Sequence, residues 1–269
     1  MLRTTATTVI LGFTSALGAA VAAEPSAGTP GLSAAQIVER VVAARGGAAA
    51  WHELHSLTWK GKMGAGATHY EVVTKGKLET RQRDESMLPF TFDYQRPLKT
   101  RLEIQFSGQT AVQVYDGASG WKLRPYLGRA GWDAYSADEL RQAQVQPGID
   151  GYLIDYAAKG ARVELAGTER VEDQLTYKLK VTQKGGQVRH VWVNSSTFLE
   201  TKVEGEPRRL DGKPHNVEIF LREYRSEGRL VMPHLIETRV NGVAQAEKIV
   251  IDSVTVNPKL DDARFTKST

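Results

Sequence analysis

The chain contains no cysteine among its 269 residues. This absence excludes disulfides, thiolate metal sites and cysteine nucleophiles, so the folded chain must be stabilised by burial in a large core. It also lacks any block of like charge: 35 Lys and Arg are interspersed with 31 Asp and Glu, for a formal net charge of +4. Such a mixed surface argues against a nucleic-acid-binding protein.

Long apolar runs are missing except at the N-terminus. Residues 9–23 carry no charge, follow Arg3, and end in Val21-Ala22-Ala23. A positive start, a short apolar stretch and small residues at the end predict a cleaved signal peptide over residues 1–23. The stretch is shorter than the roughly 20 residues that span a membrane. We therefore expect an exported protein with no transmembrane segment after cleavage, a flexible leader over residues 24–32, and a single domain over residues 33–269.

A helix is predicted at the start of this domain. Ser33 is followed three residues later by Gln36, the spacing of a capping box, and Gly46-Gly47 ends the helix. The apolar residues between them recur at helical spacing: Ile37, Val38, Val41 and Val42. A short turn is expected over residues 48–54.

Alternation of apolar and polar residues then replaces the helical pattern. It is clearest in "LTWKGKM" from Leu57, "LKTRLEIQF" from Leu98 and "LTYKLKV" from Leu175. Alternation is typical of antiparallel strands with one buried face. Short turns separate about ten or eleven such strands. A mainly β protein is therefore predicted, with one long antiparallel sheet that curls to bury its apolar face.

One stretch, residues 125–156, interrupts the alternation. Ser136 and Glu139 have capping-box spacing, which predicts a short helix over residues 139–145. A further helical turn is predicted over residues 149–156. We expect this segment and the N-terminal helix to cover the mouth of the curved sheet, with the mid-chain segment acting as a lid.

The stretch "VQVYDGASGWKL" contains Gly117-Ala118-Ser119-Gly120, which is close to the G-x-S-x-G of serine hydrolases. A nucleophile elbow needs glycine two residues after the serine and a helix beyond it. Trp121 occupies that position, and both flanks resemble strands. A hairpin turn is the favoured interpretation; a hydrolase using Ser119 is the less favoured one.

Histidines and acidic residues do not form a recognisable metal or catalytic motif. His52 and His55 are spaced i, i+3, whereas a zincin helix needs H-E-x-x-H. Surface residues at the end of a helical turn are the favoured interpretation. We predict no enzyme activity, no metal and no cofactor.

Large aromatic residues are the remaining candidates for function. On a curled sheet with few covering helices, they indicate a hydrophobic cavity, although packed core is the alternative for any one of them. The residues predicted to line this cavity are Leu57, Trp59, Leu102, Ile104, Trp121, Trp132, Tyr135, Tyr177 and Trp192.

The chain resembles the LolA-like group, the outer-membrane lipoprotein-sorting proteins and their relatives. The resemblance runs from about Leu32 to Phe265 and is carried by the helix ending in Gly-Gly, the β meander, "VYDGASGW" and the closing "VTVNPKLDDARF". It implies an unclosed half-barrel with helices over a hydrophobic cavity, in the periplasm. The sorting proteins hold the lid closed with an arginine on the sheet. Arg101 and Arg189 are both predicted on the polar face, which is the wrong side for that role.

The resemblance favours a periplasmic carrier or binding protein for lipid or acylated, lipoprotein-like ligands. Exposing acyl chains to water costs about 0.8 kcal/mol per CH₂, so such cargo needs a protein that hides it. The expected partners are a hydrophobic or acylated ligand and periplasmic or outer-membrane proteins, with the chain itself a monomer. The alternative is a non-catalytic periplasmic scaffold or sensor domain that binds another protein.

Overall fold

The computed structural model describes residues 31–64, 69–74, 77–82, 86–128, 131–210 and 212–267. The predicted signal peptide and all of the predicted leader before Gly31 lie outside the described residues. None of the described helices has the length and apolar content needed to span a membrane.

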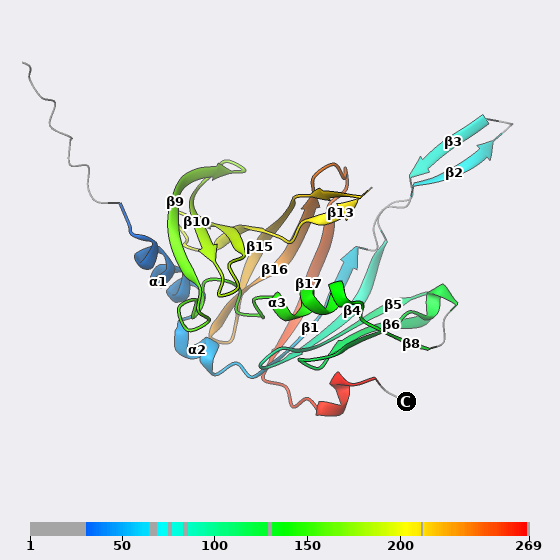
Figure 1. Ribbon diagram of the computed structural model, residues 1–269, viewed down its shortest axis with the longest axis horizontal. Coiled ribbons are helices and arrows are strands. Elements are labelled where there is room, and N and C mark those ends of the chain that lie inside the picture. The colour runs from blue at the N-terminus through cyan, green and yellow to red at the C-terminus, as the bar shows by residue number, and fades with distance from the viewer. Residues whose placement is uncertain are drawn as a thin grey trace, which may run out of the picture. The chain divides into compact units, whose positions relative to one another are not determined.

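One antiparallel sheet of 13 strands dominates the described chain (Figure 1). Its strand order is β8-β7-β6-β5-β4-β1-β17-β16-β15-β12-β11-β10-β9. The N-terminal half supplies β1 (Ser56–Gly64), β4 (Met87–Gln95), β5 (Lys99–Phe106), β6 (Gln109–Tyr115), β7 (Gly120–Leu123) and β8 (Trp132–Ala134). The C-terminal half supplies β9 (Arg162–Val171), β10 (Gln174–Thr182), β11 (Val188–Asn194), β12 (Glu200–Glu204), β15 (Val217–Glu227), β16 (Leu230–Val240) and β17 (Glu247–Val256).

The two halves join in the middle of the sheet, where β17 pairs with β1. Leu57 lies opposite Val256, and Trp59 opposite Val254. The edge strands are β8 and β9, so the sheet does not close. The predicted mainly β fold, with an unclosed half-barrel sheet, is confirmed.

The sheet has more strands than the ten or eleven predicted. β7 and β8 have four and three residues, too few to show an alternating pattern. Two separate hairpins also form: β2 (His69–Thr74) with β3 (Lys77–Gln82), and β13 (Arg208–Leu210) with β14 (Lys213–His215). The β2–β3 hairpin forms a separate small sheet, so β1 pairs with β4 in the large sheet.

Both predicted capping boxes are present. The Ser33 hydroxyl accepts from the Gln36 amide at the start of α1 (Ala34–Ala44), and Ser136 does the same for Glu139 at α3 (Ala137–Val145). A five-residue helix, α2 (Ala48–His52), occupies the predicted turn. Two residues after the end of α1, Gly46 has φ +105°, and a Cβ there would lie 1.9 Å from the Arg229 carbonyl oxygen. Only glycine fits there.

The helical turn predicted over residues 149–156 is wrong. Gly148, Gly151 and Asp155 all have positive φ, at +72°, +77° and +53°. Left-handed residues at this spacing prevent consecutive helical hydrogen bonds, so the segment forms a series of tight turns.

The main core lies on the face of the sheet that carries α2, α3 and the turns after α3, which we call the inner face. Trp51 of α2 is fully buried there with Leu54, Leu57 and Ile154. Tyr94, Leu230 and Met232 complete the cluster. Residues of the central strands β1, β4 and β16 thus meet beneath α2 and the turns, which holds this part of the inner face closed.

The opposite, outer face has a core of its own. Val112 and Val114 of β6 pack there against Phe265, which is fully buried. Phe265 belongs to a 3-10 helix, η2 (Asp262–Phe265), near the C-terminus. The C-terminal segment thus covers the outer side of β6, leaving alternate β6 residues to face inward.

Candidate functional site

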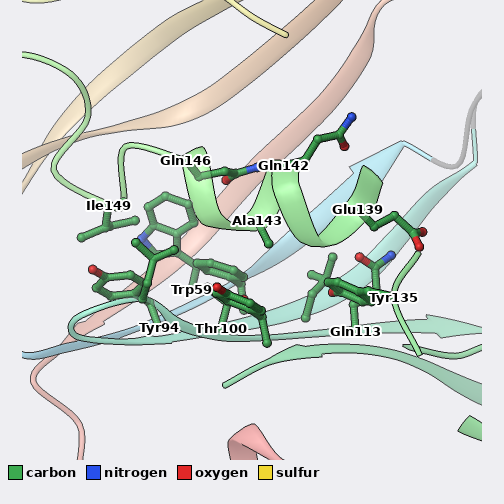
Figure 2. Close-up of a pocket in the computed structure, with 15 residues that line it drawn as sticks. Trp59, Tyr94, Thr100, Gln113, Tyr135, Glu139, Gln142, Ala143, Gln146 and Ile149 are labelled. Atoms are coloured by element: carbon green, nitrogen blue, oxygen red, sulfur yellow. The ribbon is translucent and has the colours of Figure 1, made fainter. Parts of the chain in front are cut away.

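A cleft of about 530 Å³ lies between α3 and the inner face of the sheet (Figure 2). The strands β1, β4, β5 and β6 provide its floor with Trp59, Phe92, Tyr94, Thr100, Leu102, Gln113 and Tyr115. Helix α3 and the residues flanking it provide the other side with Tyr135, Glu139, Gln142, Ala143, Gln146 and Ile149. Amphipathic α3 has no buried residue, because its inward side faces this cleft and not a packed core.

A smaller cavity of about 200 Å³ continues along the inner face beneath the turns after α3. Its walls are mostly aliphatic and come from β12, β15 and β16: Val203, Ile219, Leu221, Met232, Pro233 and Ile236. Trp59, Gly148 and Ile149 line both cavities and so mark the point where they meet.

The small cavity contains a buried ion pair. Arg45 Nη1 lies 2.5 Å from Glu200 Oε2, and both side chains are about 95 % buried. Arg45 also donates from Nε to the Val231 carbonyl at 2.8 Å and lies over the Trp51 ring. The charges thus neutralise each other, and the rest of the wall is apolar.

The larger cleft is more polar, but its charges are also paired. Glu139 forms an ion pair with Lys122 of β7. The Lys122 hydrogen bond, with the Ser136 cap, holds the pKa of Glu139 below its ordinary value of 4.5, so the carboxylate stays ionised. Burial, with the Glu139 charge adding to it, raises the pKa of Tyr135 to about 12, so its hydroxyl stays protonated.

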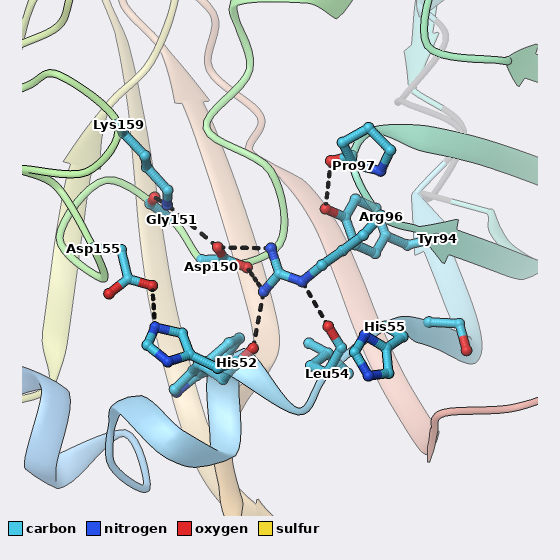
Figure 3. Close-up of polar contacts among 12 residues, drawn as sticks. His52, Leu54, His55, Tyr94, Arg96, Pro97, Asp150, Gly151, Asp155 and Lys159 are labelled. Atoms are coloured by element: carbon cyan, nitrogen blue, oxygen red, sulfur yellow. Dashed lines mark hydrogen bonds and ion pairs between the residues drawn. The ribbon is translucent and has the colours of Figure 1, made fainter.

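The turns after α3 are fastened by a cluster of ion pairs (Figure 3). Arg96, just after β4, donates to both carboxylate oxygens of Asp150, at 3.1 and 2.8 Å, and to the Leu54 and Trp51 carbonyls. Lys159 lies 3.4 Å from the same carboxylate. The bidentate Arg96–Asp150 pair fixes the segment to α2 and β4 at one end of the cleft.

Tyr152 lies against the C-terminal half of the sheet, near strand β11. Burial raises the pKa of its hydroxyl, and the nearby polar groups of Arg189 on β11 and of Gln183 oppose this rise. The prediction that Arg189 lies on the polar face is wrong. Arg189 pairs across the strands with buried Val181 and is itself 9 % exposed. Arg101 does lie on the outer face, where it donates to the Arg264 carbonyl.

The structure brings some of the predicted cavity residues together and separates others. Trp59, Leu102 and Tyr135 line the larger cleft. Leu57 is packed in the inner core, and Ile104 shares the face of Leu102. Trp121 and Trp132 pack around Phe265 on the outer face. Trp192 packs with Val171 and Phe220, and Tyr177 stacks on Phe198. Their contact with a ligand stays a prediction.

The polar side chains of the cleft were missed by the sequence analysis. Gln113 alternates with Val112 and Val114, and a polar residue between two apolar ones is typical of a solvent-exposed face. Gln142 and Gln146 lie on and just after α3. In the sequence, Asp138, Gln142 and Gln146 are each four residues apart, which places them on one side of a helix. This spacing does not show that the side faces a cavity.

The Ser119 stretch is a hairpin turn, as favoured above. The Asp116 carboxylate accepts hydrogen bonds from the amides of Ala118 and Ser119, at 2.8 and 2.7 Å, and Gly117 has φ +101°. His52 contacts Asp155 at 2.7 Å and so belongs to the fastening of the turns. Within the described ranges, no three metal-ligating side chains of His, Asp or Glu come together.

Comparison with known proteins defines the class by its fold. No family model matches the sequence, and no curated protein matches it. Solved structures do match the fold of this chain. A LolA superfamily protein from Nitrosomonas europaea superposes with a TM-score of 0.54 and 15 % identity, covering 88 % of this chain and 98 % of the other. A DUF1329 family protein from Desulfovibrio piger gives 0.52 and 14 %, covering 87 % and 97 %. The chain has the LolA-like fold.

Proposed function

We propose that this protein is a periplasmic carrier or binding protein for lipids or acylated ligands. The cleft beneath α3 carries the proposal. Its floor is aromatic and aliphatic, it continues into a cavity with mostly aliphatic walls, and its roof is a helix attached through side-chain contacts. An apolar cavity with a few polar groups is the usual form of a small-molecule site.

The roof supports the proposal because it has the features of a movable cover. Helix α3 has no buried residue of its own. It is held to the sheet by the ion pair of Glu139 with Lys122, whereas the turns after it are anchored by the Asp150–Arg96 pair and by buried Ile154 in the inner core. The polar contacts of α3 can exchange with water when the helix lifts, at a smaller cost than opening the packed apolar interface beneath the turns.

The experiment is a titration with N-phenyl-1-naphthylamine, whose fluorescence rises in apolar surroundings. The mature protein should bind it with micromolar affinity. Ala143→Trp, which fills the cleft from α3, should weaken binding at least about ten-fold. Arg141→Trp, on the exposed side of the same helix, is the matched control and should bind normally. Equal binding by both variants would place the probe elsewhere and contradict the proposal.

A further inference from the structure

The two cavities differ in their chemistry, and this difference restricts what they can hold. The smaller cavity has mostly aliphatic walls beside the neutral Arg45–Glu200 pair. The larger cleft adds amide and hydroxyl groups from Gln113, Gln142 and Gln146 and from its tyrosines. A ligand that occupies both would therefore have an apolar tail and a hydrogen-bonding, polar portion.

Charge restricts the polar portion further. Among the described residues that line the two cavities, Arg45, Glu139 and Glu200 are the charged ones, and each is paired: Arg45 with Glu200, and Glu139 with Lys122. An ionised carboxylate or phosphate placed in these two cavities would find no unpaired cation among the residues that line them, and burying an unpaired charge is costly. A neutral group, such as a hydroxyl, ester or amide, carries no such cost.

The volumes restrict the number of chains. A water-sized group occupies roughly 30 Å³ in a liquid, so cavities of about 530 and 200 Å³ together hold on the order of two dozen such groups. That matches one long acyl chain with a small head. Two long chains would need more than this space.

Trp59 provides a specific contact where the cavities meet. Its Nε1 is buried and has no hydrogen-bond partner among the described residues. An orphaned buried donor is unfavourable and calls for an explanation. Figure 2 shows Ile149, which follows α3, beside the Trp59 ring. Displacing Ile149 would open Nε1 to an acceptor on the ligand.

From these observations, and resting on the proposed function, we infer that the ligand is an uncharged, single-chain amphiphile. Its acyl tail lies in the smaller cavity, its hydroxyl- or amide-bearing head lies in the larger cleft, and the carbonyl between them accepts a hydrogen bond from Trp59 Nε1.

The test is competition for the bound naphthylamine probe by three lipids of equal chain length: 1-palmitoylglycerol, ionised palmitate and dipalmitoylglycerol. The neutral monoester should compete best, with the acid and the two-chain lipid each at least about ten-fold weaker, because of the charge and the volume limits. Equal or better competition by palmitate, or by dipalmitoylglycerol, overturns the inference but leaves the proposed function intact. Failure of the probe itself to bind contradicts the proposed function instead.

Trp59→Phe tests the carbonyl contact. It removes the N–H and keeps an aromatic ring. Affinity for 1-palmitoylglycerol should fall about five-fold, the loss expected for one hydrogen bond, while affinity for the probe, which has no carbonyl, should stay unchanged. Trp121→Phe, on the outer face, is the matched control. An unchanged monoester affinity in Trp59→Phe, or an equal loss for probe and monoester, overturns the proposed contact. A melting temperature close to that of the parent establishes that the variant is folded.

Discussion

Removing the Asp150 carboxylate should release the turns that cover one end of the cleft. In Asp150→Ala, Arg96 loses two charge-assisted hydrogen bonds and Lys159 loses its ion-pair partner. The Asp150 side chain is 6 % exposed and that of Arg96 is 32 % exposed. Water can therefore replace the carboxylate on one side of the guanidinium but not on the side that faces the protein.

These exposures set the magnitude. Breaking a buried ion pair costs about 3–5 kcal/mol, whereas an exposed pair contributes about 0–1 kcal/mol. A pair with one buried and one partly exposed member lies between, so the free energy of unfolding should fall by about 2–3 kcal/mol in Asp150→Ala. Asp150→Asn keeps an acceptor and the side-chain volume, and should lose less.

Urea unfolding measures the global change, and amide hydrogen exchange measures the local one. Exchange should accelerate at the Lys159 and Gly160 amides, which donate to Asp155 and Ala157 within the turns. Glu53→Ala, which breaks the solvent-exposed ion pair with Arg229, is the control. It should change the free energy of unfolding by less than about 1 kcal/mol. Asp150→Ala with unaltered stability and unaltered exchange would refute the assigned role of this pair.

Three further predictions concern the surroundings of the cleft. The pKa of Glu139 is lower in the folded protein, so the stabilisation from this group is present above pH 4.5 and is lost as the pH falls below it. Glu139→Gln should therefore reduce the loss of stability at acid pH, as measured by urea unfolding over a range of pH. Because the pKa of Tyr135 is raised to about 12, its stabilisation is complete below pH 10 and disappears between pH 10 and 12; Tyr135→Phe should reduce that loss, and an unchanged alkaline limb would contradict the shift. Phe265→Ala should lower the free energy of unfolding by about 3–5 kcal/mol in calorimetry, because the ring is fully buried on the outer face, and a loss below about 1 kcal/mol would disprove its place in that core.

Much of the fold follows from local sequence patterns. The capping residues Ser33 and Ser136 set the starts of α1 and α3, and period-2 alternation identifies the long strands. The pairing of β17 with β1 could not be predicted, because alternation gives the face of a residue within its strand but not the neighbouring strand.

The site was less predictable for a related reason. Alternation assigns residues to the two faces of a strand, but it does not show which other segments of the chain pack on each face. Trp121 was predicted to line the cavity, because only the cavity-facing side of the sheet was expected to be apolar. Phe265, more than 100 residues away in sequence, packs on that face and makes it apolar. Gln113 thus faces the cleft and Trp121 faces Phe265.

The fastening of the lid segment also depends on contacts distant in sequence. Arg96 and Asp150 are 54 residues apart, and neither lies in a recognisable motif. The positive φ values of Gly148 and Gly151 turn the chain so that Asp150 points to Arg96 and not along a helix. Sequence periodicity contains no information on such tertiary pairs.

Native mass spectrometry of the mature protein, purified without detergent from the periplasm of expressing cells, tests the central claim most directly. The account predicts a population carrying one additional lipid-sized mass, which organic extraction removes and which Ala143→Trp lacks. A protein that repeatedly has only its own polypeptide mass, and that also takes up no added lipid, would contradict a hydrophobic ligand site beneath α3.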